Sequence, residues 1–292
     1  MKNVRTAAAL GLFDGVHLGH RAVLAAAAEQ KARGLVPCAF TFPPESTAEK
    51  GAAGYIYSSS EKSFIMTERC GIERIFSPPF ADVCGMDGDT FAREVLRGEM
   101  RAEFVCCGND FRFGRGASCG IAELRGFGAE YGFEVLAVDD VLCGGERVSS
   151  TLIRSLLEKG ETERANEFLG EPYIIMKKVS RGAQLGRTIG FPTANQIFDR
   201  GQLVPRYGVY ASAAVVDGKR YPSVTDIGMK PTVDYGGAPL AETYIHGFSG
   251  DLYGSPLRVE LIGFIRPEMR FGSIEELKAQ IKEDMKSALN IL

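Results

Sequence analysis

The sequence predicts an α/β domain followed by a β domain that ends in a helix. Over the first 170 residues, short apolar runs alternate with helical patterns, which is typical of a parallel sheet covered by helices. Over residues 171–292, strand patterns follow one another closely and turn signals such as Asp217-Gly218 separate them, which favours a small antiparallel β-barrel or sandwich. Gly170 and Pro172 end the last helical pattern between the two halves. We therefore expect domains at 1–170 and 171–292.

In the first domain, apolar runs predict strands at residues 6–13, 35–42, 74–76, 104–107 and 133–138. The segments between and after them predict helices at 17–33, 61–70, 89–97, 122–131, 150–158 and 161–169. Gly34 follows the first helix and Gly170 the last, and glycine is the residue most often found just after a helix. This order of elements favours a parallel sheet.

In the second domain, strands are expected at 173–179, 208–216, 221–228, 242–248 and 257–265. The chain then ends in one helix, because Ser273 and Glu276 form a capping-box pattern. An apolar stripe at spacings of three and four follows, consisting of Ile274, Leu277, Ile281, Met285 and Leu289. We expect this stripe to pack against the barrel and assign it no catalytic role.

The composition excludes several classes of protein. The net charge of -3 argues against a nucleic-acid-binding protein, which would carry a basic surplus. No apolar stretch approaches the roughly 20 residues that span a bilayer. Asp14 ends the first apolar run after too few residues for a secretory signal, so we expect a cytoplasmic protein without a membrane partner. The oligomeric state stays open.

The seven cysteines all lie in the first half, and their odd number without a C-x-x-C pair argues against a disulfide framework or a zinc site. Cys106 and Cys107 lie in a predicted strand. We expect both to act as small buried hydrophobic residues.

The strongest local pattern is Gly11-Leu-Phe13-Asp14-Gly15-Val-His17-Leu-Gly19-His20, where the first strand gives way to the first helix. A helix N-terminus presents free N–H groups and the positive end of the helix dipole, so it favours phosphate. His17 and His20 are three residues apart, so both imidazoles can face one point. There they would donate hydrogen bonds to charge that builds on a phosphate. The alternatives are two histidines that pack a turn, or a zinc site, for which no third ligand stands at a suitable spacing.

This segment resembles the H-x-G-H signature of nucleotidyltransferases, in the form found in bacterial FAD synthetases. Gly108-Asn-Asp110-Phe111-Arg112-Phe113-Gly114 resembles the same family's G-x-D-F-R-F-G segment, and Ser149-Ser150-Thr151-Leu-Ile-Arg154 resembles its S-S-T-x-I-R segment. The resemblance implies a Rossmann-like nucleotidyltransferase domain. It also implies a set of flavin-binding residues, namely Asp110, Phe111, Arg112 and Phe113. A further set would bind the nucleotide, namely Gly11, Phe13, Asp14, Gly15, Gly19, Ser150 and Thr151.

Physical reasoning agrees with the resemblance at several of these positions. Arg112, Arg115 and Arg154 offer forked donors that suit phosphate. Ser150 and Thr151 can cap the helix that follows them. The alternatives are surface arginines and an ordinary helix cap.

A second phosphate site is predicted in residues 181–195, Arg-Gly182-Ala-Gln-Leu-Gly186-Arg187-Thr-Ile-Gly190-Phe-Pro-Thr193-Ala-Asn195. Glycines and an arginine suit a loop wrapped around phosphates, and the Thr193 hydroxyl can bind Mg²⁺ beside them. The alternative is a glycine-rich segment that only turns a corner of the barrel.

The segment resembles the G-R-x-x-G-F-P-T-A-N signature of riboflavin kinases, which usually follow this adenylyltransferase in one chain. Two later segments, starting at Asp226 and Ala241, resemble the kinase's N-I-G-x-R-P-T segment and its strand with the catalytic glutamate. The resemblance implies that Glu242 is the general base, and that Thr193 and Asn195 hold Mg²⁺. Gly182, Gly186, Arg187 and Gly190 would bind nucleotide.

The whole chain is therefore predicted to make FMN from riboflavin and ATP, and FAD from FMN and ATP. His17, His20 and Arg154 would stabilise the adenylyl transfer without covalent chemistry. The chain departs from the family patterns at Glu45, in the segment that follows the second predicted strand, where a histidine is usual. In its kinase half it departs at Arg181, Asp226, Tyr244 and Gly247. Two alternatives stay open: an adenylyltransferase for another phosphate substrate, and a degenerate flavin-binding regulatory protein.

Overall fold

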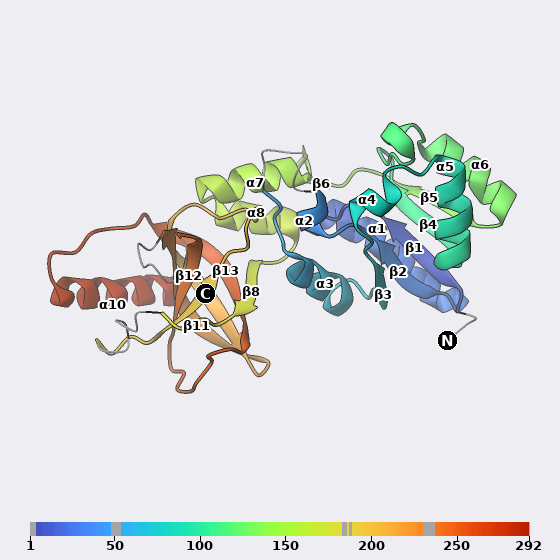
Figure 1. The fold of residues 1–292 in the computed structure, drawn as a ribbon. Helices are drawn as coiled ribbons and strands as arrows, with labels where there is room; N and C mark the ends of the chain where they lie inside the picture. Colours follow the sequence, from blue (N-terminus) through green and yellow to red (C-terminus); the bar gives the residue numbers. More distant parts are fainter. Residues whose placement is uncertain (1–3, 48–53, 183–185, 187–188, 230–236, 292) are drawn as a thin grey trace. The chain divides into compact units, whose positions relative to one another are not determined.

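The computed structural model describes residues 4–47, 54–182, 186, 189–229 and 237–291. Its contacts divide the chain into two compact units, Met1–Ser150 and Thr151–Leu292. Both units carry their own sheet (Figure 1). The predicted order of an α/β domain followed by an antiparallel β domain with a C-terminal helix is confirmed, and the β domain is a curled sheet that forms a half-barrel.

The first unit is built on a parallel sheet of order β3-β2-β1-β4-β5. Its strands are β1 (Thr6–Leu10), β2 (Val36–Phe40), β3 (Arg74–Phe76), β4 (Ala102–Gly108) and β5 (Glu134–Val138). The longer helices are α1 (Leu18–Glu29), α3 (Ser59–Glu68), the π-helix Phe91–Glu99 and α6 (Ile121–Tyr131). Shorter elements are the 3₁₀ turns Gln30–Arg33 and Arg115–Ala117, the helices α2 (Pro44–Thr47), α4 (Phe80–Val83) and α5 (Gly88–Thr90), and the hairpin β6 (Leu142–Cys143) and β7 (Glu146–Arg147).

The central strands are buried on both faces, as their apolar runs predict. On one face, Ala8 and Leu10 pack in a core with Phe91, Leu96 and Leu124 from the π-helix and α6. On the other face lies α1, where the buried Cys106 thiol approaches the Val23 carbonyl. Helix α1 thus begins at the carboxyl end of β1 and lies along the sheet.

The helix predicted at 89–97 differs in form from expectation. It starts as the single turn α5 and continues as the π-helix Phe91–Glu99. Its apolar residues, including Phe91, Val95 and Leu96, still face the core. Sequence periodicity detects that buried face, but it does not distinguish a π-helix from an α-helix.

The second unit begins with α7 (Ser150–Lys159) and α8 (Thr162–Leu169) and then forms an antiparallel sheet of order β8-β13-β10-β11-β12-β9. The strands are β8 (Tyr173–Lys178), β9 (Thr193–Ile197), β10 (Gly208–Val216), β11 (Lys219–Met229), β12 (Pro239–Ile245) and β13 (Pro256–Arg266), and the last helix is α10 (Ile274–Ile291). A bridge between Ser180 and Asn195 joins the chain just beyond β8 to β9, so the sheet curls towards closure.

Several local predictions in this unit can be compared directly with the structure. Asp217 and Gly218 have φ values of 49° and 77° and join Val216 to Lys219 as a two-residue hairpin turn, as predicted. The strand expected at 242–248 is shifted and runs from Pro239 to Ile245, which places Glu242 at its centre.

The apolar stripe of α10 packs only in part. Met285 is buried with Val209 and Val224 of the sheet, whereas Ile274 and Leu289 are about half exposed. Leu277 and Ile281 line a cavity instead. The five residues of the stripe therefore lie in three surroundings: the core, the cavity and the solvent. The N-terminal end of α10 extends past the sheet that the helix covers (Figure 1).

Candidate functional sites

The first site lies at the carboxyl end of β1, where the chain turns into α1. β1 pairs with β2 on one side and β4 on the other, so the strand order reverses direction at this point of the sheet. In open parallel sheets, ligands bind outside the carboxyl ends of the strands at such a switch point. The segment Gly11–His20 occupies that position, and the Gly108–Gly114 segment follows the neighbouring strand β4.

The turn has an unusual backbone. Phe13 and Val16 adopt left-handed φ values of 51° and 39°, and Gly15 adopts 86°. A side chain at Gly15 would also be blocked, because an added Cβ would lie 2.8 Å from the Ile56 side chain. Non-glycine residues in this region are strained and persist only where surrounding contacts hold them. The backbone conformation of this turn therefore depends on contacts with surrounding residues such as Ile56.

His17 caps the N-terminus of α1. Its Nδ1 accepts a hydrogen bond from the backbone N–H of His20 at 3.3 Å, so the proton of the neutral ring must be on Nε2. An added Cβ at Gly19 would lie 3.2 Å from the His17 ring, which explains the glycine there. The two rings stack with centroids 3.6 Å apart and planes 15° apart. The prediction that both imidazoles face one point is consistent with this geometry.

Both rings are held neutral. Burial lowers the pKa of His17 to about 4, and nearby Arg147 opposes its charge further. Burial, followed by His17 and Lys62, lowers the pKa of His20 well below its usual value. Within the described residues, the buried Nδ1 of His20 has no hydrogen-bond partner. The pair can thus donate hydrogen bonds to a phosphate without bringing positive charge of its own.

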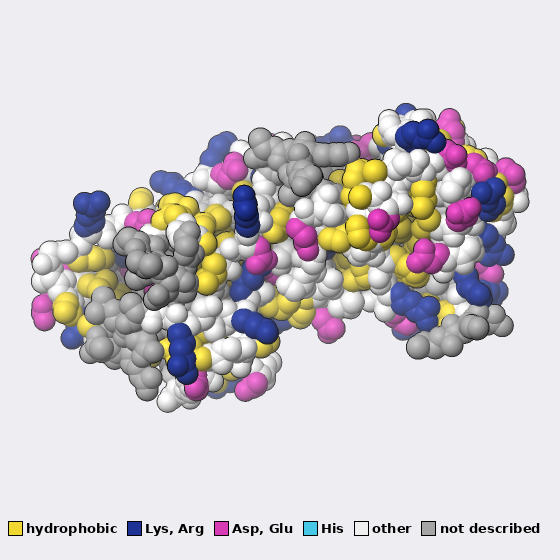
Figure 2. All heavy atoms as spheres, in the orientation of Figure 1, with side chains coloured by type: hydrophobic (Ala, Val, Ile, Leu, Met, Phe, Trp, Pro, Cys, Tyr) yellow, Lys and Arg dark blue, Asp and Glu magenta, His cyan; other side chains and the backbone are white. Residues whose placement is uncertain are grey.

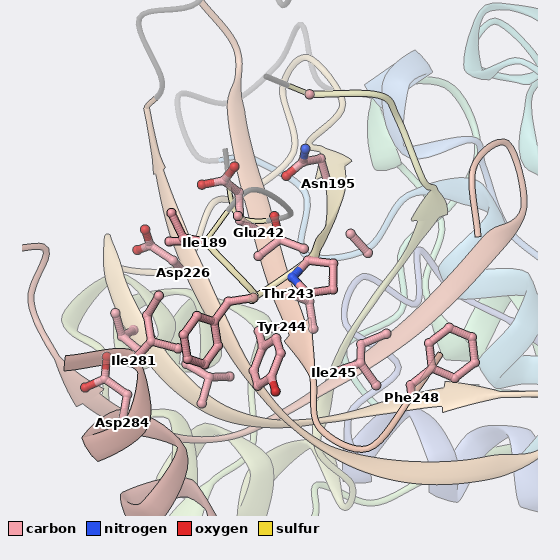
Figure 3. A pocket seen from close by; sticks show the side chains of 18 of the residues that line it. Ile189, Asn195, Asp226, Glu242, Thr243, Tyr244, Ile245, Phe248, Ile281 and Asp284 are labelled. Carbon is pink, nitrogen blue, oxygen red and sulfur yellow. The ribbon is translucent and has the colours of Figure 1, made fainter. Parts of the chain in front are cut away.

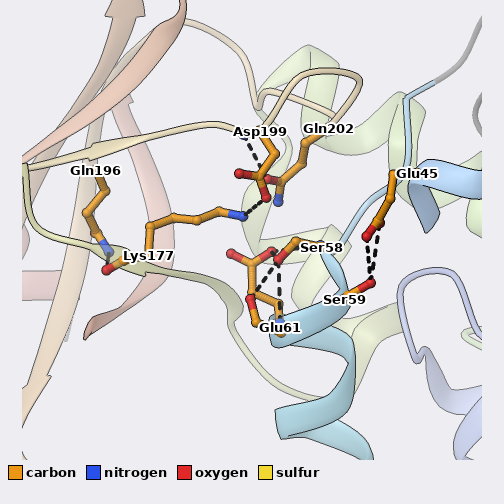
Figure 4. Close-up of polar contacts among 9 residues, drawn as sticks. Glu45, Ser58, Ser59, Glu61, Lys177, Gln196, Asp199 and Gln202 are labelled. Carbon is orange, nitrogen blue, oxygen red and sulfur yellow. Dashed lines mark hydrogen bonds and ion pairs between the residues drawn. The ribbon is translucent and has the colours of Figure 1, made fainter. Parts of the chain in front are cut away.

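The carboxylates nearest the turn have partners within the first unit. Asp14 Oδ1 accepts a hydrogen bond from the Ile56 N–H at 2.8 Å, and the Asp14 carbonyl accepts one from the Ser150 hydroxyl at 2.8 Å. Glu45 accepts a hydrogen bond from the Ser59 hydroxyl at 3.1 Å, at the start of α3 (Figure 4). Glu45, which replaces the histidine of the family pattern, is therefore anchored to the N-terminus of a helix, where a negative charge is favoured.

The segment after β4 divides the predicted flavin residues into two groups. Asp110 is exposed and forms an ion pair with Arg147 at 2.8 Å. Arg112 is exposed and donates from Nε to the Ala117 carbonyl at 3.1 Å. Phe111 and Phe113 stack with centroids 5.8 Å apart, but Phe113 is buried in the core. Asp110 and Arg112 therefore lie at the surface, whereas Phe113 packs behind Phe111, and the predicted contact of these residues with flavin stays a prediction.

The division between the two units falls within the S-S-T-x-I-R segment, after Ser150. Ser150 reaches the first turn through its bond to the Asp14 carbonyl. Thr151 and Arg154 belong to α7 and to the second unit. Their predicted contact with the nucleotide stays a prediction.

The second site is a cavity of about 940 Å³ in the second unit (Figure 3). Three polar residues stand in one row across neighbouring strands of its wall: Asp226 on β11 faces Glu242 on β12, and Glu242 faces Asn195 on β9. Residues directly opposite in an antiparallel pair have Cβ atoms about 5 Å apart. Thr193 lies two residues along β9 on the same face, so the predicted base and both predicted metal ligands line one cavity.

The row has the chemistry of a magnesium site. Asn195 is 5% exposed, and its buried Oδ1 has no hydrogen-bond partner among the described residues. Asp226 and Glu242 add carboxylate oxygens on the two adjacent strands. Carboxylate, amide and hydroxyl oxygens are ligands that Mg²⁺ accepts, together with waters and substrate phosphates. The residues present therefore fit the ion that the sequence predicts.

The glycine-rich loop borders the same cavity. Gly190 has a φ of 87°, and Gly186 accepts a hydrogen bond from the Phe191 N–H at 2.8 Å, with no room for a Cβ beside the Phe191 carbonyl. Gly182 and Gly186 line the cavity. Arg187 lies outside the described residues, as does the Lys230-Pro231-Thr232 part of the segment that begins at Asp226.

The cavity is also lined by residues to which the sequence pattern gives no role. Arg266 of β13 forms a double hydrogen bond with Asp284 of α10, at 2.9 and 2.7 Å, and the Asp284 side chain is 3% exposed. Tyr244 stands opposite Thr193 and meets the Phe191 ring edge-on, with centroids 5.2 Å apart. These contacts join β9, β12, β13 and α10 around one space, which only the folded chain reveals.

The chain is similar to known proteins along its whole length. A family model described as FAD synthetase matches residues 1–152, and one described as riboflavin kinase matches residues 169–292. The bifunctional riboflavin kinase/FMN adenylyltransferase of Escherichia coli K12 is 37% identical over 281 residues, which cover 94% of this chain and 89% of that protein. The protein of the same name from Bacillus subtilis is 33% identical over 301 residues, covering 99% and 93%.

A solved structure resembles the whole chain. It comes from Streptococcus pneumoniae, is named a macrolide-efflux protein, and matches with a TM-score of 0.83 at 26% identity, covering 99% of this chain and 95% of that one. Among the residues that the present structure describes, no helix is long and apolar enough to cross a membrane.

Proposed function

We propose, because the chain belongs to the family of bifunctional riboflavin kinase/FMN adenylyltransferases, that its two sites divide the two reactions of that family. The kinase reaction converts riboflavin and ATP into FMN and ADP, and we place it in residues 171–292. The adenylyltransferase reaction converts FMN and ATP into FAD and pyrophosphate, and we place it in residues 1–170. The predicted cytoplasmic location stays a prediction.

At the first site, an FMN phosphate oxygen attacks the α-phosphorus of ATP as the bond to pyrophosphate breaks. His17 donates from Nε2 to the phosphate oxygens on which charge builds, because its Nδ1 is used by the His20 N–H. The free N–H groups at the start of α1 add positive potential at the same place. Ser150 fixes the turn through the Asp14 carbonyl. The family resemblance gives Arg154 the role of a further forked donor to the phosphates.

The flavin of FMN lies against the segment that follows β4. Phe111 offers a ring face, backed by the buried Phe113, and Asp110 and Arg112 offer polar groups at the surface. Aromatic rings stack well on planar ligands. The position of this segment beside the switch point supports the assignment.

At the second site, Glu242 accepts the proton of the ribityl 5′-hydroxyl. The freed oxygen attacks the γ-phosphorus, and the bond to ADP breaks. Thr193 and Asn195 would hold Mg²⁺, whose charge would offset that of the ATP phosphates. In phosphoryl transfer, positioning and charge neutralisation provide most of the rate. The loop with Gly182, Gly186, Arg187 and Gly190 would wrap the nucleotide.

The observation that carries this proposal is the row formed by Asp226, Glu242 and Asn195 beside Thr193 in one cavity. The test is incubation of the chain with riboflavin, ATP and Mg²⁺, followed by chromatography. We expect FMN first and FAD later. FAD formation from supplied FMN without riboflavin phosphorylation would point to an adenylyltransferase alone, and neither product would point to a flavin-binding protein.

A further inference from the structure

Lys62 is a buried lysine beside the first site. It lies in the first turn of α3 and is 4% exposed. Its ammonium donates three hydrogen bonds: to the Phe42 carbonyl at 2.7 Å, to the Thr41 hydroxyl at 3.0 Å and to the Leu12 carbonyl at 3.2 Å. Because an ammonium has three N–H groups, all of its donors are used.

The three acceptors come from two loops that border the site. Leu12 directly precedes Phe13, the residue with a left-handed φ of 51° in the turn that leads to the histidines. Thr41 and Phe42 directly follow β2, and the Thr41 hydroxyl itself donates to the Leu12 carbonyl at 2.8 Å. Lys62 thus ties the carboxyl ends of β1 and β2 together, and it does so at the strained part of the turn.

The start of α3 is itself fixed against the turn. A reciprocal capping box joins Ser58 and Glu61 at its N-terminus (Figure 4). Two residues earlier, Ile56 donates its N–H to Asp14 and fills the space beside Gly15. The segment from Ile56 to Lys62 therefore contacts the turn at Leu12, Asp14 and Gly15. The contact to Leu12 is the one made by a charged side chain, that of Lys62.

Filling a buried space with a lysine costs free energy, because its charged ammonium is removed from water. Burial lowers the pKa of its ammonium to about 8, and the carboxylates of Asp14 and Glu45 oppose that shift. A methionine would occupy similar volume without the penalty of burying a charge. The charge is also within electrostatic reach of His20, whose pKa it helps to lower. Its placement among carbonyl oxygens beside the imidazole pair indicates a role in the site rather than in packing alone.

We propose that Lys62 is a positioning residue for adenylyl transfer, which holds the Leu12 carbonyl and thereby the turn that aims His17 and His20 at the phosphates. Its positive charge also favours the neutral form of His20 and adds attraction for ATP. This inference rests on the proposed function of the first site. It adds α3 to the three segments that the sequence pattern assigns to this site.

The first test compares Lys62→Met with Lys31→Met in the full-length chain. Lys31 is an exposed lysine of the same unit that forms a surface ion pair with Glu73, so its replacement is a matched control. We expect kcat for FAD formation from FMN to fall about 10- to 100-fold in Lys62→Met, since a small misplacement of catalytic groups has effects of that size. Riboflavin phosphorylation should stay unchanged in both variants, and Lys31→Met should keep full FAD formation.

The second test begins with the pH dependence of the wild-type chain. The charged groups that face Lys62 are Asp14 from the β1–α1 turn, Glu45 from α2 and the titratable ring of His20 from α1. A neutral amine has two N–H groups for three acceptors, so the wild-type rate of FAD formation should fall as the pH rises through about 8. Lys62→Arg should move this fall beyond pH 10, because a guanidinium stays protonated there.

The outcomes separate the two proposals. Wild-type chain that forms no FAD overturns the proposed function itself. Wild-type chain that forms FAD while Lys62→Met keeps its full rate overturns the role of Lys62 alone. A wild-type rate that is flat from pH 7 to 9 does the same, whether or not Lys62→Met folds.

Discussion

The two candidate sites present opposite kinds of chemical group, hydrogen-bond donors in the first and acceptor oxygens in the second. The first offers hydrogen-bond donors: a helix N-terminus and the neutral imidazoles of the buried His17 and the half-buried His20. Its nearest carboxylates, Asp14 and Glu45, accept hydrogen bonds from Ile56 and Ser59. The second uses acceptor oxygens, with Asp226, Glu242 and Asn195 in one row.

The scaffolds of the two sites differ in the same sense. The first site is a loop, and its strained turn is held from outside by Ile56, Ser150 and Lys62. The second is a face of a sheet, where the register between β9, β11 and β12 alone sets the spacing of the groups. The first site needs well-placed backbone N–H groups, which a loop at a helix N-terminus provides. The second site needs well-spaced side-chain oxygens, which the register of paired strands provides.

Glu242→Gln should have the largest effect. The amide keeps the size of the side chain but cannot accept the substrate proton, so riboflavin phosphorylation should fall by about 10²- to 10⁴-fold. FMN adenylylation should persist, because the first site does not contain this carboxylate. The measurement is FMN and FAD formation from each substrate separately. Glu275→Gln, on the exposed first turn of α10, is the control and should keep both activities. Equal loss of both activities in Glu242→Gln would contradict separate sites.

His20→Ala should give the reverse pattern. Loss of one half of the stacked imidazole pair should lower FAD formation from FMN by about 10²-fold, a size typical for a lost donor to a transition-state oxygen. Riboflavin phosphorylation, measured in the same preparation, serves as the control for folding. Undiminished FAD formation would rule out the first site as described.

Asp226→Asn should have a smaller effect. Loss of the carboxylate beside Glu242 should raise the Mg²⁺ concentration for half-maximal kinase rate by several-fold, because one charged oxygen ligand fewer would face the cation. The measurement is a Mg²⁺ titration of FMN formation. A lower Mg²⁺ requirement in the variant would contradict a cation beside this row.

The last prediction concerns stability rather than activity, namely the pH dependence of the free energy of unfolding. The pKa of His17 is about 4 in the folded chain and near 6.5 when unfolded, so between these values only the unfolded chain binds the proton. The free energy of unfolding should therefore fall as the pH is lowered from about 6.5 to 4, by roughly 1–3 kcal/mol from this group. His17→Asn keeps a good helix cap and should weaken that dependence. Chemical denaturation at several pH values measures it, and identical slopes would show that His17 is not buried neutral.

Much of this molecule follows from local sequence. Strand β10 runs from Gly208 to Val216 as its apolar pattern predicts, and the Asp217-Gly218 turn forms because that dipeptide accepts left-handed φ values. The motif at Gly11–His20 is predicted at a strand-to-helix turn and lies at one. These features depend on neighbours in the chain, so the chain alone is sufficient to predict them.

Other features escaped local reasoning. Strand β9, Thr193–Ile197, follows Pro192 in a glycine-rich segment that has the appearance of a loop, and only its pairing with β12 makes it a strand. From the sequence, the carboxylate of Glu45 is expected to repel a phosphate. The structure shows instead that it accepts a hydrogen bond from the Ser59 hydroxyl. Lys62 shows no motif at all, since its three acceptors are 20 to 50 residues away in sequence.

The sequence by itself determined which residue types meet phosphate, because helix termini, glycine turns and oxygen ligands are properties of short segments. The tertiary structure alone decided which residues face one another: Asp226 opposite Glu242, Arg266 on Asp284, and Lys62 on Leu12. Pairing across strands and burial of a charge are set by segments far apart in the chain. Their energies exist only when the fold brings those segments together.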